Sequence, residues 1–263
     1  MTERADETIK ALRSGHDDLA ALVRDFTADD LARPSGASKW DVSQVLSHLG
    51  SGAEISLASL EGALEGTGGP GGDFNQGVWA RWDAMSREER AEGFLRANET
   101  LTRRYEGLDA QTRQNLRIDL GFLPAPVDVA AAGGLRLNEL AHHTWDVKVA
   151  FDPAATLPPE ATPLLFDQAA LLIGFLGRAG ELGRTATIAV ETTSPERSFG
   201  LDVGENVTVV EAPANPDAVL TTPAEWWLRL TSGRHAPEHT PATVALTGDD
   251  ITLDDLRRVF PGF

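Results

Sequence analysis

Residues 136 to 151 read RLNELAHHTWDVKVAF, and their apolar spacing predicts a helix with Glu139 and His143 four positions apart. Successive helical positions turn by about 100°, which places one stripe of side chains toward a core. The stripe consists of Arg136, Leu140, His143, Val147 and Ala150, with Glu139 and Phe151 at its edges. A carboxylate and an imidazole therefore point inward. A buried carboxylate is costly unless a cation, a donor or a metal lies beside it, so Glu139 needs a partner.

Two interpretations of this pair remain open from spacing alone. Glu139 and His143 could satisfy each other or an arginine by hydrogen bonding, or they could bind one metal ion, since side chains four apart reach the same point. His142 is a rival ligand because it is three residues from Glu139. It projects about 100° away from His143, on the polar side of the stripe, so we favour His143.

Composition excludes several classes of function. The 263 residues carry a net charge of −17, and lysine occurs only at positions 10, 39 and 148, which argues against nucleic acid as a partner. The chain has no cysteine, so disulfides, thiolate ligands and a cysteine nucleophile are excluded, and any metal must be held by His, Asp, Glu or carbonyl oxygen.

Membrane and export signals are also missing from the sequence. No apolar run approaches the roughly 18 residues of a membrane span, and the N-terminus MTERADETIK has no signal pattern. We expect a cytoplasmic protein that acts on a small-molecule substrate and does not bind membranes. The oligomeric state cannot be deduced from the sequence.

The first half of the chain predicts a four-helix bundle. The expected helices span about 3–26, 37–64, 86–108 and 136–151, and a glycine-dense loop is expected at 66–77. Ser38 or Asp41 is expected to cap the second helix, and Ser86 with Glu89 has capping-box spacing at the start of the third.

The pattern changes after Asp152. Residues 153–163 carry four prolines and indicate a linker, so we expect domains at 1–152 and 153–263. The second domain shows an α+β pattern. Its expected helices are 164–179, 224–230 and 252–259, and its expected strands are 185–192, 198–203, 207–211, 218–221 and 243–246.

His48 is the natural third ligand because it comes from another helix of the same predicted bundle. A lone histidine beside an apolar stripe can also be simply solvated. Two histidines with one glutamate, however, form a ligand set that leaves a fourth position open, as in catalytic zinc sites. Asp146 is three residues from His143 and could accept its second ring N–H, although capping or a salt bridge would explain it equally well.

The remaining histidines are weaker candidates. His16 precedes Asp17 and Asp18 and is expected to be exposed. His235 and His239 are four apart, but they lie in a proline-containing loop where helical ligand geometry does not apply. Trp145 projects away from the ligands and is expected to pack against a loop or the second domain. No G-x-S-x-G motif and no dinucleotide fingerprint occurs.

Two segments, KWDVSQVLSHLG and RLNELAHHTWDVKVA, give the chain a resemblance to the mycothiol-dependent maleylpyruvate isomerase family, part of the DinB-like group of metal-binding four-helix bundles. The family pattern on the second helix is matched by Trp40, Val45, His48 and Leu49. The pattern E-x-x-x-H-x-x-D on the fourth helix is matched by Glu139, His143 and Asp146. The resemblance thus selects the same three ligands.

The resemblance implies a fold and a function. The fold would be a DinB-like bundle followed by a smaller α+β domain similar to sterol carrier proteins. A divalent metal, zinc, would activate a low-molecular-weight thiol such as mycothiol for isomerisation or S-transfer on a small electrophile. An arginine of the second domain would help to bind the substrate, with Arg229 and Arg234 as candidates.

Two other classes of function stay open at this point. The same scaffold could hydrolyse a substrate with a metal-bound water, without any thiol. Alternatively, the chain could be a non-catalytic binding module in which the second domain carries an apolar ligand. A structural metal site would have four protein ligands, whereas the sequence offers three.

Overall fold

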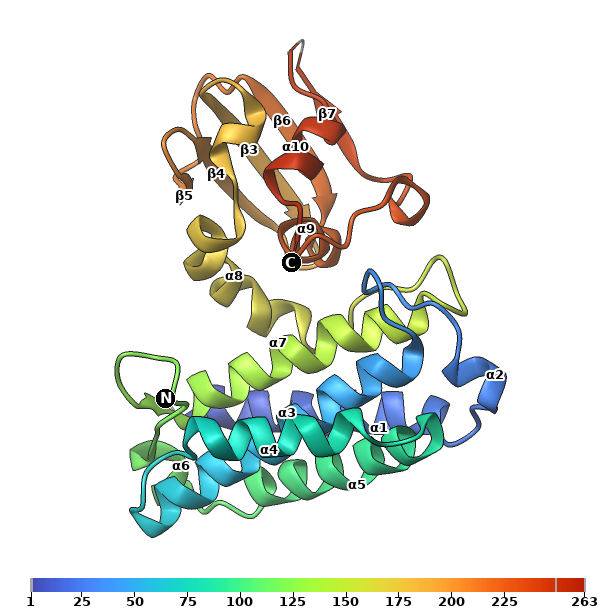
Figure 1. The fold of residues 1–263 in the computed structure, drawn as a ribbon. Coiled ribbons are helices and arrows are strands. Elements are labelled where there is room, and N and C mark those ends of the chain that lie inside the picture. The colour runs from blue at the N-terminus through green and yellow to red at the C-terminus, as the bar shows by residue number, and fades with distance from the viewer. Residues whose placement is uncertain (1, 249, 263) are drawn as a thin grey trace. The chain divides into compact units, whose positions relative to one another are not determined.

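The computed structural model describes residues 2–248 and 250–262, so the outer ends of the two expected domains, Met1 and Phe263, lie outside it. By their internal contacts the residues form two compact units that divide between Asp152 and Pro153. Figure 1 shows the first unit as helices and the second as a sheet with helices. Each unit is described by itself below.

The first unit is built on four long helices, which are α1 (Thr2–Val23), α3 (Val42–Glu65), α5 (Arg87–Glu106) and α7 (Val129–Lys148). α1 packs against α5 and α7, and α3 packs against the same two helices, so the four close into a bundle (Figure 1). The sequence prediction of a four-helix bundle is confirmed. The short elements are α2 (Ala28–Leu31), α4 (Gly72–Asp83), α6 (Ala110–Asn115), β1 (Arg117–Ile118) and β2 (Val127–Asp128).

Local sequence signals set the helix ends. Asp41 accepts a hydrogen bond from the backbone N–H of Gln44 at the start of α3, and Ser86 with Glu89 forms the expected capping box of α5. Asp128 caps α7 in the same way. α3 ends at Gly66, whose φ of 72° is the left-handed conformation that glycine adopts without strain. These signals fix where α3 and α7 begin, and hence the positions of their side chains.

The glycine-dense stretch at 66–77 is only partly a loop, which corrects the expectation from sequence. α4 begins at Gly72 and carries Trp82, which is buried. The indole ring fills the space over Gly50 of α3 and Gly93 of α5, where a Cβ would collide with it. Burial of this large side chain stabilises a helix that glycine content alone disfavours.

The second unit contains a five-stranded sheet with the order β5-β4-β3-β6-β7, in which only β3 and β6 pair in parallel. The strands are β3 (Ala186–Thr193), β4 (Arg197–Val203), β5 (Val207–Val210), β6 (Ala218–Pro223) and β7 (Ala245–Thr247). The helices are α8 (Thr162–Leu176), α9 (Ala224–Thr231) and α10 (Leu253–Val259), with 3-10 turns η1 (Ala179–Leu182) and η2 (Pro237–His239).

This arrangement confirms the predicted fold class, a helical bundle followed by a smaller α+β domain. Each predicted strand of the second domain forms, with β7 shifted by about two residues toward the C-terminus. The closer resemblance to sterol carrier proteins stays a prediction. Within the described part of the chain, no helix combines the length and apolar character needed to cross a membrane.

Candidate metal centre

The structure brings together the three side chains that the sequence singled out. α3 contributes His48, and α7 contributes Glu139 and His143, with one ligand atom from each within 4.8 Å of the others. His48 Nε2 lies 2.7 Å from Glu139 Oε2, and His143 Nε2 lies 3.6 Å from the same oxygen. The two imidazole rings meet edge to face at 4.6 Å between centroids. Their role as metal ligands stays a prediction that this geometry allows.

The packing of α3 against α7 creates this meeting point. Leu49 follows His48 and Leu140 follows Glu139, and both leucines are fully buried in the bundle. Their burial fixes the rotation of each helix, so the neighbouring polar groups lie at the edge of the shared interface. The exposed fractions of the side chains are 39% for His48, 44% for Glu139 and 13% for His143. The cluster is therefore accessible from solvent on one side.

Asp146 holds His143 in place. Its Oδ2 lies 2.8 Å from His143 Nδ1, and its side chain is completely buried. The backbone carbonyl of Asp146 also accepts a hydrogen bond from Gly36, which ties α7 to the segment before α3. With Nδ1–H donated to Asp146, the imidazole presents the lone pair of Nε2 to the cluster, as a metal-binding histidine requires.

Aromatic side chains close one side of the cluster. The Trp40 ring lies 5.3 Å from that of His48 and 6.0 Å from that of His143. Trp145 is buried against the segment at Gly36, so the expected packing of Trp145 against a loop is confirmed. Trp40 thus reduces the freedom of both imidazoles and gives the centre an apolar wall.

The charges around Glu139 favour its ionised form. Burial by itself raises the pKa of Glu139, but the hydrogen bond with His48 and the nearby charges of His143, His48 and Arg136 outweigh it and bring the pKa to about 2. Arg136 lies one turn earlier on α7. Burial lowers the pKa of Arg136 to about 10, while Glu139 and Tyr105 act in the opposite direction. At neutral pH the centre therefore contains a carboxylate anion and a guanidinium cation.

His142 is buried, whereas the helical projection placed it on the polar side. Its Nδ1 lies 2.9 Å from the carbonyl oxygen of Asn138 on the same helix, and it is not part of the three-ligand cluster. The projection was wrong because α7 packs against both α1 and α3, so more than one of its faces is covered. The preference for His143 over His142 agrees with this placement.

His16 is also buried, with an exposed fraction of 2%, so the expectation of exposure was wrong. Its Nδ1 lies 3.0 Å from Asn98 Nδ2, and its Nε2 lies 3.1 Å from Glu99 Oε2. The acidic pair after His16 suggested solvent, but the buried Leu12 and Leu19 on either side of it belong to the core face of α1. Burial lowers the pKa of His16 and keeps the ring neutral at pH 7.

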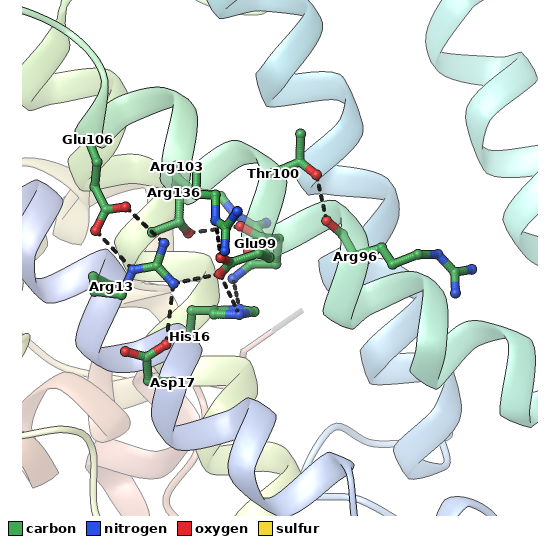
Figure 2. Close-up of polar contacts among 11 residues, drawn as sticks. Arg13, His16, Asp17, Arg96, Glu99, Thr100, Arg103, Glu106 and Arg136 are labelled. Carbon is green, nitrogen blue, oxygen red and sulfur yellow. Dashed lines mark hydrogen bonds and ion pairs between the residues drawn. The ribbon is translucent and has the colours of Figure 1, made fainter.

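His16, Asp17 and Glu99 form a second group of potential ligands, but arginines already occupy its carboxylates. Arg13 binds Asp17, Glu99 and Glu106, and Arg103 also binds Glu99 (Figure 2). These ion pairs lower the pKa of Glu99 and satisfy its oxygens. This group therefore stabilises the contact between α1 and α5 and is a poor metal site.

The candidate substrate arginines lie in the second unit. Arg229 is fully buried in α9 and forms a two-armed pair with Glu225, from Nε at 2.8 Å and Nη2 at 2.9 Å. Arg234 Nη1 donates to the carbonyl oxygen of Ser232. These contacts give Arg229 a structural role in its own unit, while a role in substrate binding stays a prediction for both.

The second unit contains two histidines, and each has a different hydrogen-bond partner. His235 Nε2 lies 2.6 Å from the carbonyl oxygen of Phe260, and His239 Nδ1 lies 3.3 Å from that of Pro153. Among the residues that the structure describes, neither belongs to a group of potential metal ligands. This agrees with the view that their spacing in a loop carries no ligand geometry.

Sequence reasoning did not assign a role to Arg136 or Asn98. Arg136 Nη2 donates to Asn98 Oδ1 and to the carbonyl oxygen of Leu49, each at 2.8 Å. The available signal was an arginine on an otherwise apolar helical stripe, since such a position requires acceptors from other helices. The identity of these acceptors depends on tertiary packing.

The fold and the centre together define a helical-bundle protein with a candidate three-ligand metal site and a second α+β unit. The family model of the mycothiol maleylpyruvate isomerase N-terminal domain matches residues 12–148, more than half of the chain, and the chain belongs to this family. Its bundle is of the DinB-like kind that the sequence predicted.

Solved structures support the same fold over nearly the whole chain. The crystal structure of the mycothiol-dependent maleylpyruvate isomerase and that of a histidine-to-alanine mutant each align with a TM-score of 0.64, at 13% identity and with 92% of both chains covered. A search of curated proteins found no match. The similarity at this identity establishes the architecture, and the function must be argued from the residues.

Proposed function

We propose that the protein is a metal-dependent enzyme that uses a low-molecular-weight thiol, such as mycothiol, for isomerisation or S-transfer on a small electrophilic substrate. The observation that carries this proposal is the convergence of His48, Glu139 and His143 from two helices at an accessible edge of the bundle. Membership of the mycothiol maleylpyruvate isomerase family supports the choice of a thiol. We place the reaction in the cytoplasm, where small thiols stay reduced.

The three side chains fit a divalent ion. Nitrogen and oxygen ligands of a tetrahedral zinc ion lie roughly 3.3–3.6 Å from one another, given bonds of about 2.0–2.2 Å. The separation of His143 and Glu139, 3.6 Å, is within this range, and that of His48 and Glu139, 2.7 Å, needs a small outward rotation. Both His48 and Glu139 are partly exposed. We propose zinc as the ion and these three residues as its protein ligands.

The chain itself provides no sulfur nucleophile, since it has no cysteine. Three protein ligands leave one position of a tetrahedral ion for an exogenous group. A divalent ion held there lowers the pKa of a bound thiol, so that a thiolate is available at neutral pH. In such a centre the chain would hold the zinc ion with three ligands, and the co-substrate would supply the sulfur nucleophile.

The protein residues orient this chemistry. Asp146 keeps the Nε2 lone pair of His143 directed at the centre, and Trp40 limits the motion of His48 and His143. In an isomerisation the thiol sulfur adds to a conjugated double bond, the resulting single bond rotates, and the sulfur leaves again. In an S-transfer the sulfur stays on the attacked carbon, and the leaving group departs with the bonding electrons. The protein residues have the same roles in both reactions.

Substrate binding by the second unit is part of the proposal. Arg229 is buried and paired with Glu225 inside its unit, so a variant at Arg234 tests substrate binding without removing that pair. Replacement of Arg234 by Met should raise KM for an anionic substrate while leaving the metal content unchanged. An unchanged KM would remove Arg234 from the substrate site.

Elemental analysis and spectroscopy of the purified chain test the function directly. Loading the protein with cobalt in place of zinc and adding a small thiol should produce a sulfur-to-metal charge-transfer band, which His48→Ala should abolish. His239→Ala is the matched control, because that imidazole lies outside the cluster. A metal content that stays below about one-tenth equivalent after zinc is added would refute the metal-dependent function. Turnover without any thiol would instead favour a hydrolase.

A further inference from the structure

Arg136 is a buried cation whose hydrogen-bond acceptors are both neutral. Its exposed fraction is 5%, and its Nη2 donates to the carbonyl oxygen of Leu49 and to Asn98 Oδ1. Its Nε is buried and finds no hydrogen-bond partner among the described residues. A buried guanidinium is costly unless an anion compensates it, so the charge of Arg136 must be balanced from elsewhere.

Glu139 is the anion that balances Arg136. The two residues are three apart on α7, which places their Cβ atoms roughly 5–6 Å from each other. Burial lowers the pKa of Arg136 to about 10, which still leaves it charged at pH 7, while Glu139 and Tyr105 act in the opposite direction. Burial raises the pKa of Tyr105 to about 12, so its phenol is neutral at pH 7 and Glu139 provides the compensating charge.

The guanidinium of Arg136 also lies close to the other helix of the centre. Leu49, whose carbonyl oxygen accepts from Nη2 at 2.8 Å, directly follows His48 on α3. Arg136 is thus held beside the backbone next to one candidate ligand and one helical turn before another. Leu49 and Asn98 are themselves buried, so the positive charge is fixed in position and shielded from solvent. A charge in such a place is screened much less than one at the surface.

We propose that Arg136 is a positioning residue of the metal centre: acting through Glu139, its fixed positive charge weakens the binding of the divalent ion and favours an anionic ligand at the open position. A metal ion that binds Glu139 engages the charge that balances Arg136, so two cations share one carboxylate. The inference rests on the proposed function in requiring that His48, Glu139 and His143 bind a divalent ion.

This competition suits a centre whose fourth ligand is a thiol. One carboxylate neutralises only part of the charge of a divalent ion, and Arg136 adds a further positive charge nearby. An anionic sulfur ligand is therefore favoured over a neutral one, because it restores the balance of charge in a partly buried site. Arg136 would produce this preference without touching the bound molecule.

A purely structural role for Arg136 predicts the opposite change in metal affinity. Its hydrogen bonds connect α7 to α3 through Leu49 and to α5 through Asn98. If these bonds served only to hold the helices together, their loss would loosen the approach of His48 to the two ligands on α7, and metal binding would weaken. The sign of the change therefore separates the electrostatic role from the structural one.

Arg136→Met and Arg136→Lys provide the test. Methionine keeps an unbranched side chain with good helix propensity and removes the charge, whereas lysine retains the charge. Zinc affinity is measured by competition with a chelator at pH 8, where histidines are largely neutral. We expect Arg136→Met to bind zinc about tenfold more tightly than the wild type, and Arg136→Lys to stay within about threefold of it.

A second measurement follows the ligand at the open position. Each protein is loaded with cobalt and titrated with 2-mercaptoethanol, and the sulfur-to-cobalt charge-transfer band reports binding. We expect Arg136→Met to bind the thiol about tenfold more weakly than the wild type, and Arg136→Lys to resemble the wild type. Loosened packing would weaken both affinities, so a tighter metal with a weaker thiol in one variant identifies an effect of charge.

Arg104→Met is the matched control. Arg104 also joins α5 to α3, because its Nε and Nη2 donate to Glu61 at 2.7 Å and 3.0 Å. Glu61 lies far from the centre, since it is separated from His48 by roughly 20 Å along α3. This variant removes the same charge from the chain and should leave both affinities unchanged. A change as large as that in Arg136→Met would overturn the inference, because the net charge of the chain would then explain it.

Zinc affinity in Arg136→Met that equals or falls below that of the wild type would also overturn the inference. If Arg136→Met shows no cooperative thermal melt, Asn98→Asp decides the question. The new carboxylate accepts from Arg136 and compensates its charge, while His16 can donate Nδ1–H to it after a change of tautomer. Tighter zinc binding in Asn98→Asp supports the inference, and unchanged or weaker binding overturns it.

The proposed function fails in a different way. A wild-type chain that binds no zinc would refute the metal-dependent function and this inference with it. A wild type that binds zinc, together with variants of unchanged affinity, would refute only the role of Arg136. The two failures are therefore distinguishable.

Discussion

Two clusters of histidine and carboxylate lie in the same bundle, and they differ in how their charges are compensated. In the first, His48, Glu139 and His143 face one another at a partly exposed edge. In the second, Arg13 and Arg103 occupy the carboxylates around the buried His16. Proximity of a histidine to acids is therefore not enough for a metal site. Ligand atoms also need access and freedom from competing guanidinium groups.

The largest expected effect is a loss of zinc affinity that occurs when the first cluster is changed and not when the second is changed. His48→Ala should weaken zinc binding by on the order of a hundredfold or more, because losing a direct ligand costs more than losing an outer partner. His16→Ala should leave zinc binding unchanged. Competition titration with a chelator measures both affinities. Equal losses in the two variants would contradict the distinction between the clusters.

The next effect concerns the support of the first cluster. Asp146→Asn keeps the size of a buried side chain but weakens the hold on His143 Nδ1–H. We expect zinc affinity to fall by about 10- to 100-fold, with a smaller change in folding stability. The same titration gives the affinity, and circular dichroism gives the melting temperature. Unchanged affinity would show that the Asp146 side chain does not support zinc binding through His143.

Stability should respond more strongly in the second cluster. His16→Ala leaves Asn98 without one hydrogen-bond partner in the core and creates a cavity beside Phe94, whose ring lies 6.2 Å from the imidazole. We expect the free energy of unfolding to fall by about 2 kcal/mol. Denaturant titration of the metal-free proteins measures it. A loss as large in His48→Ala, whose imidazole is partly exposed, would contradict the comparison.

The smallest expected effect is a pH dependence of folding stability, and it arises from His16 in the second cluster. Burial lowers the pKa of His16 below the 6.5 of the unfolded chain, so the unfolded state takes up a proton first as pH falls. The stability linked to His16 is present above pH 6.5 and is lost as the pH falls from about 6.5 toward the folded pKa. His16→Asn should flatten this part of the profile. Burial also lowers the pKa of His235 in the second unit, so His235 contributes to the same part of the profile. The profile of a His235 variant measures that contribution separately.

Much of the candidate centre could be predicted because it depends on short-range geometry. The spacing of Glu139 and His143 fixes both on one side of a helix, and Asp146 follows at the distance needed to reach His143. The placement of His48 required one further assumption, that the second and fourth helices of the bundle are neighbours. The misplaced residues, His16 and His142, are those whose burial depends on how many helices cover α1 and α7.

The sequence by itself determined the existence of the four long helices, the capping box of the third, the class of the second domain and the three candidate ligands, because a helix fixes the relative directions of residues three and four apart. The tertiary structure alone decided which charges meet. It placed Trp82 over Gly50 and Gly93, saturated Glu99 with arginines, and set Arg136 beside Gly52. Those contacts join residues far apart in the chain, and side-chain packing between helices, not spacing along one helix, selects them.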